Sequence, residues 1–185
     1  MARIVIAGLL ALLSGCSGSL TRGSEDSFPP ISGVTGRVER SVFLSDPGHA
    51  RFRAQYETAT VDMNLTGMIG SLSRDVKVVV FYGPWCSDSW HNVPVFLRIA
   101  EKAGIPDDRI EYYALDRSKK SRDGVEARYG IEKVPTFVFL KAEKEIGRIV
   151  ETPRTTLEGD IVAILAGAAQ RGDVRRIDRP LLSGG

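Results

Sequence analysis

The chain has 185 residues, of which 43% are hydrophobic, and its 25 Lys and Arg nearly balance its 23 Asp and Glu. This is enough apolar material for one ordinary globular domain with extensions. The charges are interspersed, which excludes the basic stripe typical of a nucleic-acid-binding protein. After the first fifteen residues, no apolar run is long enough to span a membrane.

The first fifteen residues have the pattern of a targeting segment. Arg3 supplies a positive charge, residues 4–13 form a short apolar run, and Leu-Ser-Gly then leads into Cys16. This ending resembles a bacterial lipobox, in which the peptide is cut before the cysteine and the cysteine is lipidated. The resemblance implies that residues 1–15 are a lipoprotein signal peptide and that Cys16 anchors the protein in the cell envelope. Ser17 favours the periplasmic face of the outer membrane if the organism is Gram-negative. A conventional secretory signal with an incidental cysteine, or a buried first helix, is the alternative.

Composition divides the rest of the chain into three parts. Residues 16–36 are rich in Ser, Gly and Pro without an apolar period, which predicts a flexible tether. A folded domain is expected over residues 37–170. Residues 171–185 contain few apolar side chains and end in Ser-Gly-Gly, which predicts a mostly disordered tail.

Apolar periodicity and turn signals predict the elements of the domain. In chain order these are a strand at 37–44, helices at 49–60 and 64–73, a strand at 76–81, a helix at 87–103, a strand at 109–115, a short helix at 124–129, strands at 137–140 and 145–151, and a closing helix at 155–169. Because a helix joins the strands at 76–81 and 109–115, these two strands are expected to be parallel with a right-handed crossover.

The most informative stretch leads from the strand at 76–81 into Cys86. The strand is a near-continuous run of Val and Phe, typical of a central strand covered on both faces. Gly83 and Pro84 end it, so Cys86 is expected in the first turn of the next helix. There, unpaired backbone N–H groups and the positive end of the helix dipole favour a thiolate over a thiol. Cys86 is therefore predicted to be a nucleophile, with a buried structural thiol as the alternative.

Two segments resemble the thioredoxin family. One is Trp85-Cys86-Ser87-Asp88-Ser89 with Pro94 after it, and the other is Val134-Pro135-Thr136. The resemblance implies a thioredoxin fold of the α/β class, with a central mixed β-sheet flanked by helices. It also implies a cis bond before Pro135, facing Cys86, although an ordinary trans proline at a strand start is the alternative. The residues that the resemblance places beside the substrate are Trp85, Val134, Pro135 and Thr136.

The chain departs from the Cys-x-x-Cys motif of the family's redox enzymes. Ser89 stands where the resolving cysteine would be, and if Cys16 is lipidated, Cys86 is the only thiol of the mature protein. The Ser89 hydroxyl is expected to donate a hydrogen bond that holds the Cys86 thiolate ionised, but it cannot attack a disulfide. Val80 stands where family dithiol enzymes commonly keep a buried carboxylate that serves the resolving cysteine. Cys86 and Ser89 are the predicted catalytic residues.

These observations lead to two hypotheses about function. The first is monothiol thiol–disulfide exchange, an oxidoreductase activity in which Cys86 forms mixed disulfides with protein or low-molecular-weight thiols and an external thiol completes the cycle. The second is a redox-inactive binding module that holds extended partner segments at the cis-proline groove. No cofactor is expected. His49 and His91 are the only histidines, so a metal site is not expected either.

Overall fold

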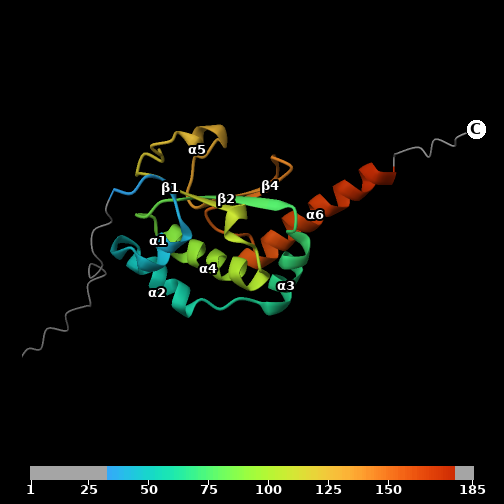
Figure 1. Cartoon of the computed structure of the whole chain (residues 1–185), viewed down its shortest axis with the longest axis horizontal. Helices are drawn as coiled ribbons and strands as arrows, with labels where there is room; N and C mark the ends of the chain where they lie inside the picture. Colours follow the sequence, from blue (N-terminus) through green and yellow to red (C-terminus); the bar gives the residue numbers. More distant parts are fainter. Residues whose placement is uncertain (1–32, 178–185) are drawn as a thin grey trace, which may run out of the picture.

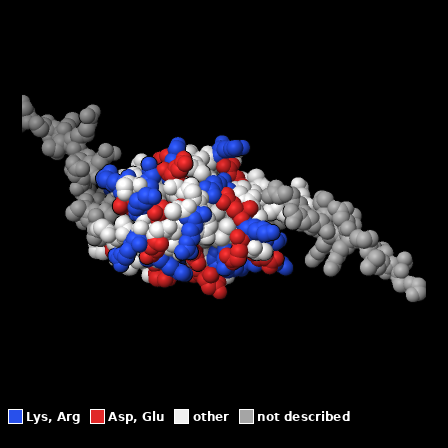
Figure 2. Space-filling model, turned by 90° about the horizontal axis from the view of Figure 1, so that it is seen from above, with Lys and Arg blue, Asp and Glu red and all other residues white. Residues whose placement is uncertain are grey.

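The structure is a computed structural model that describes the backbone of residues 33–177 and the side chains of residues 33–170. The predicted signal peptide, the lipidation site Cys16, most of the predicted tether and the end of the predicted tail lie outside this part. Figure 1 shows helices on both faces of a β-sheet. Figure 2 shows Lys and Arg interspersed with Asp and Glu over one face of the molecule.

A five-stranded mixed sheet in the order β1-β3-β2-β4-β5 forms the centre of the fold. β2 and β3 are parallel, as predicted, and the other neighbouring pairs are antiparallel. In the central strand β2 every residue except Lys77 is buried, which confirms that both faces are covered. The strands are β1 (Gly36–Val38), β2 (Val76–Tyr82), β3 (Ile110–Ala114), β4 (Thr136–Lys141) and β5 (Lys144–Val150).

The helices cover the two faces unequally. Figure 1 shows α1, α2, α3 and α4 on one side of the sheet and α5 on the other, and α6 packs against α3. The helices are α1 (Arg40–Ser45), α2 (Ala50–Thr58), α3 (Met63–Leu72), α4 (Ser87–Ala103), α5 (Val125–Arg128) and α6 (Leu157–Ile177), with 3-10 turns at Pro47–His49 and Asp107–Arg109.

Apolar side chains form two cores, one on each face of the sheet. Alternate residues of β2 divide between them, because successive side chains of a strand point to opposite faces. Val80 and Tyr82 belong to the larger core, and Val79 and Phe81 belong to the smaller core. Cys86 packs against the smaller core, so the predicted nucleophile lies at the edge of that face.

The predicted strand at 37–44 is wrong after Val38, because the chain forms helix α1 from Arg40 onward. Phe43 of this helix is fully buried, and its ring centroid lies 4.9 Å from that of Tyr82. Strand propensity reports how well a side chain fits a pleated surface. Here, burial of Phe43 in the larger core decides the local conformation instead.

One further difference concerns the closing helix, and the predicted helix before β2 is confirmed. The closing helix, predicted to end at 169, continues to Ile177, past the predicted end of the domain at 170. The helix predicted over 64–73 is present as α3, and one of its glycines has a packing role. A Cβ on Gly70 would lie 2.5 Å from the carbonyl oxygen of Ala103, so only glycine allows α3 to approach the end of α4 this closely.

Candidate functional site

Cys86 is the N-cap residue of α4, directly after the loop that follows β2. The sequence predicted Cys86 in the first helical turn. Its backbone is instead extended, with φ −96° and ψ 126°, so Cys86 lies one position before that turn. Its N–H donates to the carbonyl of Gly83 at 2.9 Å, and its carbonyl accepts from the N–H of Trp90 at 3.1 Å. The half-buried side chain therefore lies at the positive end of the α4 helix dipole.

The loop that carries Pro135 faces Cys86. The Val134–Pro135 peptide bond is cis, as the resemblance implied. The Cys86 thiol donates to the carbonyl of Val134, with 3.3 Å between Sγ and O. Thr136 is buried, and its hydroxyl donates to the carbonyl of Lys133 at 2.7 Å. The structure therefore places Val134 and Pro135 beside the Cys86 sulfur. The Thr136 hydroxyl forms its hydrogen bond within its own loop.

Ser89 supports the backbone of the site. It is fully buried, and its hydroxyl oxygen accepts a hydrogen bond from the N–H of Gly83 at 3.1 Å. Among the contacts of residues 33–170, the expected hydrogen bond from Ser89 to Cys86 does not occur. A buried N–H without an acceptor is costly, so Ser89 stabilises the loop between β2 and α4. Gly83 also leaves room for Trp85, because a Cβ on Gly83 would lie 2.8 Å from the indole ring.

Two tryptophans flank Cys86, and the indole N–H of each is bound to a backbone carbonyl. Trp85 donates to the carbonyl of Leu115 at 3.0 Å, and Trp90 donates to the carbonyl of Pro84. Both rings are half-buried. The loop that presents the sulfur is thus held both by the end of β3 and by its own helix.

Each indole also carries an arginine on its face. The guanidinium carbon of Arg51, from α2, is 4.1 Å from the ring centroid of Trp90. That of Arg117, from the loop after β3, is 5.5 Å from the ring centroid of Trp85. Sequence reasoning missed both arginines, because they lie far from Cys86 along the chain and no spacing signals their approach.

A second arrangement that the sequence did not reveal connects the cis-proline loop to α4. Asn92 is buried and donates from Nδ2 to the carbonyl of Glu151 at 3.0 Å, while the N–H of Glu151 donates to the carbonyl of Pro135 at 2.7 Å. The Glu151 carboxylate lies 2.7 Å from Nζ of Lys133, and this hydrogen bond raises the pKa of Lys133. Glu151 has a positive φ of 58°, which non-glycine residues rarely adopt, and these contacts hold it there.

One buried titratable pair lies in the larger core, at the end of β2. Nε2 of His49 is 2.9 Å from the hydroxyl oxygen of Tyr82, and Nδ1 is 3.5 Å from the carboxylate of Asp46. Burial lowers the pKa of His49, while Asp46 acts in the opposite direction. Burial raises the pKa of Tyr82. The imidazole packs against Phe43 and Tyr82 of the larger core, on the face of the sheet opposite to the smaller core.

The described residues offer neither a metal site nor a membrane span. Within residues 33–170, no group of three or more His, Cys, Asp or Glu side chains is placed to hold a metal ion. In the same part of the chain, no helix combines the length and the hydropathy that crossing a bilayer requires.

The strand, the cysteine at a helix N-terminus and the cis-proline opposite it together define a protein with the thioredoxin fold. The same overall fold occurs in a crystal structure of a Pseudomonas aeruginosa protein of unknown function. The TM-score is 0.51 at 22% sequence identity, with 71% of this chain and 93% of that chain covered.

Sequence comparison gives the family. The thioredoxin family model matches residues 43–164, and the chain belongs to the thioredoxin family. It is 30% identical over 94 residues to a thioredoxin-like protein of Acanthamoeba polyphaga mimivirus, covering 51% of this chain and 66% of that protein, just under two thirds. It is 31% identical over 99 residues to an H-type thioredoxin of Nicotiana tabacum, covering 54% of this chain and 74% of that protein.

Proposed function

We propose that the protein performs monothiol thiol–disulfide exchange through Cys86. The observation that carries the proposal is the position of the Cys86 sulfur, 3.3 Å from the Val134 carbonyl, beside the cis-proline and at the N-cap of α4. Reactive thiols commonly occupy a helix N-terminus, and half-burial leaves the Cys86 sulfur open to a partner. Membership of the thioredoxin family supports the same chemical class.

The first step is attack of the Cys86 thiolate on a partner disulfide. A bond forms between Cys86 and one partner sulfur, the partner's own S–S bond breaks, and the second sulfur leaves as a thiolate. Ser89 cannot continue the reaction, because it carries a hydroxyl and that hydroxyl is bound to the N–H of Gly83.

An external low-molecular-weight thiol must therefore complete the cycle. One thiol attacks the Cys86 sulfur, releases the partner as its dithiol and remains joined to Cys86. A second thiol attacks the sulfur of the first, which releases a small-molecule disulfide and the Cys86 thiolate. The partner is reduced by two electrons, and two equivalents of the small thiol are oxidised.

A redox-inactive binding module is the second candidate. It is favoured by the hydrogen bonds from Asn92 to Glu151 and from Glu151 to Pro135, which hold the cis-proline loop in place without any redox change. In this hypothesis an extended partner segment lies along the backbone beside Val134.

Trapping in cells distinguishes the two functions. Without a resolving sulfur, mixed disulfides at Cys86 should accumulate and appear on non-reducing gels as bands that collapse on reduction, with Cys86 identified by mass spectrometry. Cys86→Ser is the matched control and should lack them. Ser89→Cys introduces a sulfur three residues along the helix and should reduce the amount of trapped adduct. If partners are captured equally well by Cys86→Ala and no adduct forms, the binding module replaces exchange.

We further propose that lipidated Cys16 anchors the domain in the cell envelope, at the periplasmic face of the outer membrane in a Gram-negative organism. Support comes from the pattern of residues 1–16 alone. Stable anchoring takes more than one acyl chain, which a fully modified lipoprotein cysteine would carry. Cys16→Ala should therefore release or misprocess the protein on cell fractionation. A variant that is processed and membrane-bound like the wild type would contradict the anchor.

A further inference from the structure

Two arginines approach the Cys86 loop on different sides, each stacked on a tryptophan. Trp85, which carries Arg117, packs against the smaller core, whereas Trp90, which carries Arg51, packs against the larger core. Because both indoles are bound to backbone carbonyls, the rings are fixed supports for the guanidinium groups. A positive group is thus held on each side of the segment that carries the nucleophile.

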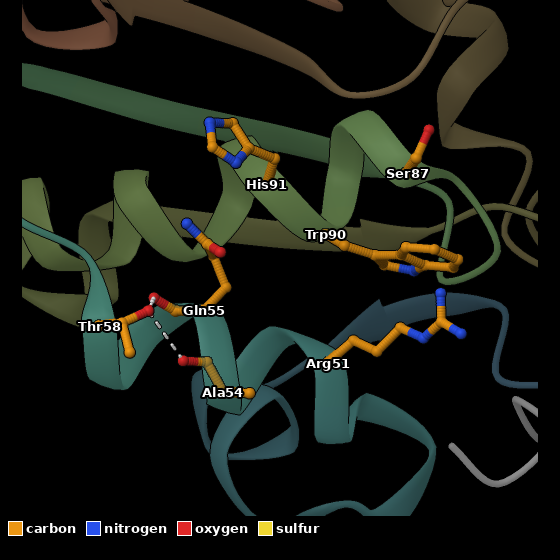
Figure 3. A pocket seen from close by; sticks show the side chains of 7 residues that line it. All are labelled: Arg51, Ala54, Gln55, Thr58, Ser87, Trp90 and His91. Carbon is orange, nitrogen blue, oxygen red and sulfur yellow. Dashed lines mark hydrogen bonds between the residues drawn. The ribbon is translucent and has the colours of Figure 1, made fainter. Parts of the chain in front are cut away.

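The Arg51 side is a groove of about 420 Å³ between α2 and α4. Figure 3 shows the Arg51 side chain reaching toward the indole of Trp90, with Ser87 at the start of α4. Ser87 follows Cys86 directly, so the groove begins at the site. Other polar groups extend it along the two helices, namely Gln55, Thr58 and His91.

The Arg117 side is the loop between β3 and α5. Its two carboxylates are engaged by the chain itself. Asp116 accepts from the Ser118 hydroxyl at 2.7 Å and from the N–H of Lys120 at 2.9 Å, and Asp123 accepts from the N–H of Arg37 at 3.1 Å.

Among the side chains described, none forms an ion pair with Arg117, which contacts the ring of Trp85. The loop's cationic side chains outnumber its carboxylates, and they are Arg117, Lys119, Lys120 and Arg122.

Stacking prepares an arginine to bind a carboxylate. When an aromatic ring lies against the face of a guanidinium, the N–H donors of the guanidinium remain free at its edge. These donors lie in the guanidinium plane and match the two oxygens of a carboxylate. Holding the side chain in place also lowers the entropy lost on binding. Asp88, in the first turn of α4, opposes a negative partner, but the cations on both sides of it are more numerous.

We propose that Arg51 and Arg117 bind carboxylates on either side of the reacting sulfur, so that Cys86 prefers partner segments whose cysteine is flanked by Asp or Glu. The inference rests on the proposed exchange function and adds the class of partner, an acidic protein segment. The covalent step is unchanged. The arginines act by raising the rate of encounter and by holding the segment in register.

The test uses the full-length protein with Cys16→Ser, so that Cys86 is the only thiol. Three synthetic peptides carry one cysteine joined by a disulfide to thionitrobenzoate and differ only in the flanking residues, which are Glu, Gln or Lys. Attack by Cys86 forms the protein–peptide disulfide and releases the coloured thionitrobenzoate anion. At low salt, the rate constant for the Glu peptide should exceed that for the Lys peptide by about tenfold, and added salt should shrink the difference.

Variants connect this preference to the two arginines. Arg51→Gln and Arg117→Gln should each reduce the ratio of the rate constants for the Glu and Lys peptides to about threefold. The double variant should bring this ratio close to one. Arg53→Gln is the matched control, because Arg53 is an exposed arginine of the same helix that donates to the Leu44 carbonyl and does not line the groove. Uncharged iodoacetamide should still alkylate Cys86 in every variant, which checks that the thiol is present and accessible, and Arg53→Gln should react at the wild-type rate.

The outcomes separate this inference from the proposed function. Equal rates with all three peptides would overturn the inference and leave exchange in place. A protein that reacts with iodoacetamide but with none of the peptides would contradict exchange itself. If the double variant instead loses binding to vesicles that contain an anionic lipid, while the peptides show no charge preference, the arginines serve a membrane surface and the inference is wrong.

Discussion

Different interactions stabilise two regions of the molecule, the loop that carries Cys86 and the region of α1 and α2. Around Cys86, side chains bind main-chain groups, as in the contacts of Trp85 with the Leu115 carbonyl and of Ser89 with the Gly83 N–H. In the α1–α2 region, aromatic rings pack against one another. The ring of Phe43 lies 4.9 to 5.6 Å from its neighbours, which are His49, Phe52, Tyr82 and Tyr112.

This difference indicates what a substitution does in each region. Loss of a ring from the α1–α2 region removes buried apolar surface and leaves a cavity, so it acts on stability. A change at the Cys86 loop removes one hydrogen bond and acts on the placement of the sulfur. In this loop, the free energy of unfolding falls only where a buried backbone group loses its hydrogen-bond partner.

The largest effect is expected for Phe43→Ala. Phe43 is fully buried among aromatic rings, and truncation of such a residue typically costs about 3–5 kcal/mol. Urea denaturation should show this loss in the free energy of unfolding. Met63→Ala is the control, because Met63 is 62% exposed, and it should change stability by about 0.5 kcal/mol or less. A Phe43→Ala protein as stable as that control would show that the ring cluster does not hold the region.

A smaller loss is expected for Ser89→Ala. The substitution leaves the buried N–H of Gly83 without its acceptor, at a cost of about 1–3 kcal/mol. Ser87→Ala provides the comparison, since Ser87 is exposed in the same turn and its loss should be near neutral. Equal unfolding free energies for the two variants would mean that Ser89 is no support for the loop.

Acid should weaken the α1–α2 region through His49. Its pKa in the folded protein is lowered by burial, so below the ordinary value of about 6.5 the unfolded state binds the proton more readily. The free energy of unfolding should therefore fall between pH 7 and pH 5, by at most about 1.4 kcal/mol per pH unit. Asp46 and Tyr82 face the imidazole, and Asp46 moderates the effect.

Two histidine variants isolate this contribution. His49→Gln should flatten the pH dependence over that interval, whereas His91→Gln, at an exposed position of α4, should leave it unchanged. Carboxylates that lose their partners in acid contribute equally to both variants, so the difference between the two curves reports His49. Parallel curves would remove His49 as the source.

The smallest effect on stability is expected for Cys86→Ala. The side chain is half-buried and makes one weak hydrogen bond, to the Val134 carbonyl, so unfolding should change by about 0.5 kcal/mol or less. The same change should abolish every adduct at this position. Thermal or urea unfolding together with non-reducing gels gives both readouts. A large destabilisation would mean that Cys86 is a structural thiol.

Most elements of the fold could be predicted from the sequence, because their signals are local. The apolar run of β2, the break at Gly83 and Pro84, and the Val-Pro-Thr segment led to the central strand, the cysteine at a helix N-terminus and the cis-proline. Prediction failed at α1, where strand propensity was outweighed by burial of Phe43, a contact made with residues distant in the chain.

What the sequence determined by itself is therefore the fold, the family resemblance and the identity of the single candidate nucleophile, since each depends on neighbouring residues. Only the tertiary structure decided that the Ser89 hydroxyl binds the Gly83 N–H and that Arg51 and Arg117 lie over the rings of Trp90 and Trp85. The arginine contacts join α2 to α4 and the β3–α5 loop to Trp85, and chain spacing carries no information about them. The direction of the Ser89 hydroxyl depended on which buried backbone group lacked an acceptor, and packing alone creates that need.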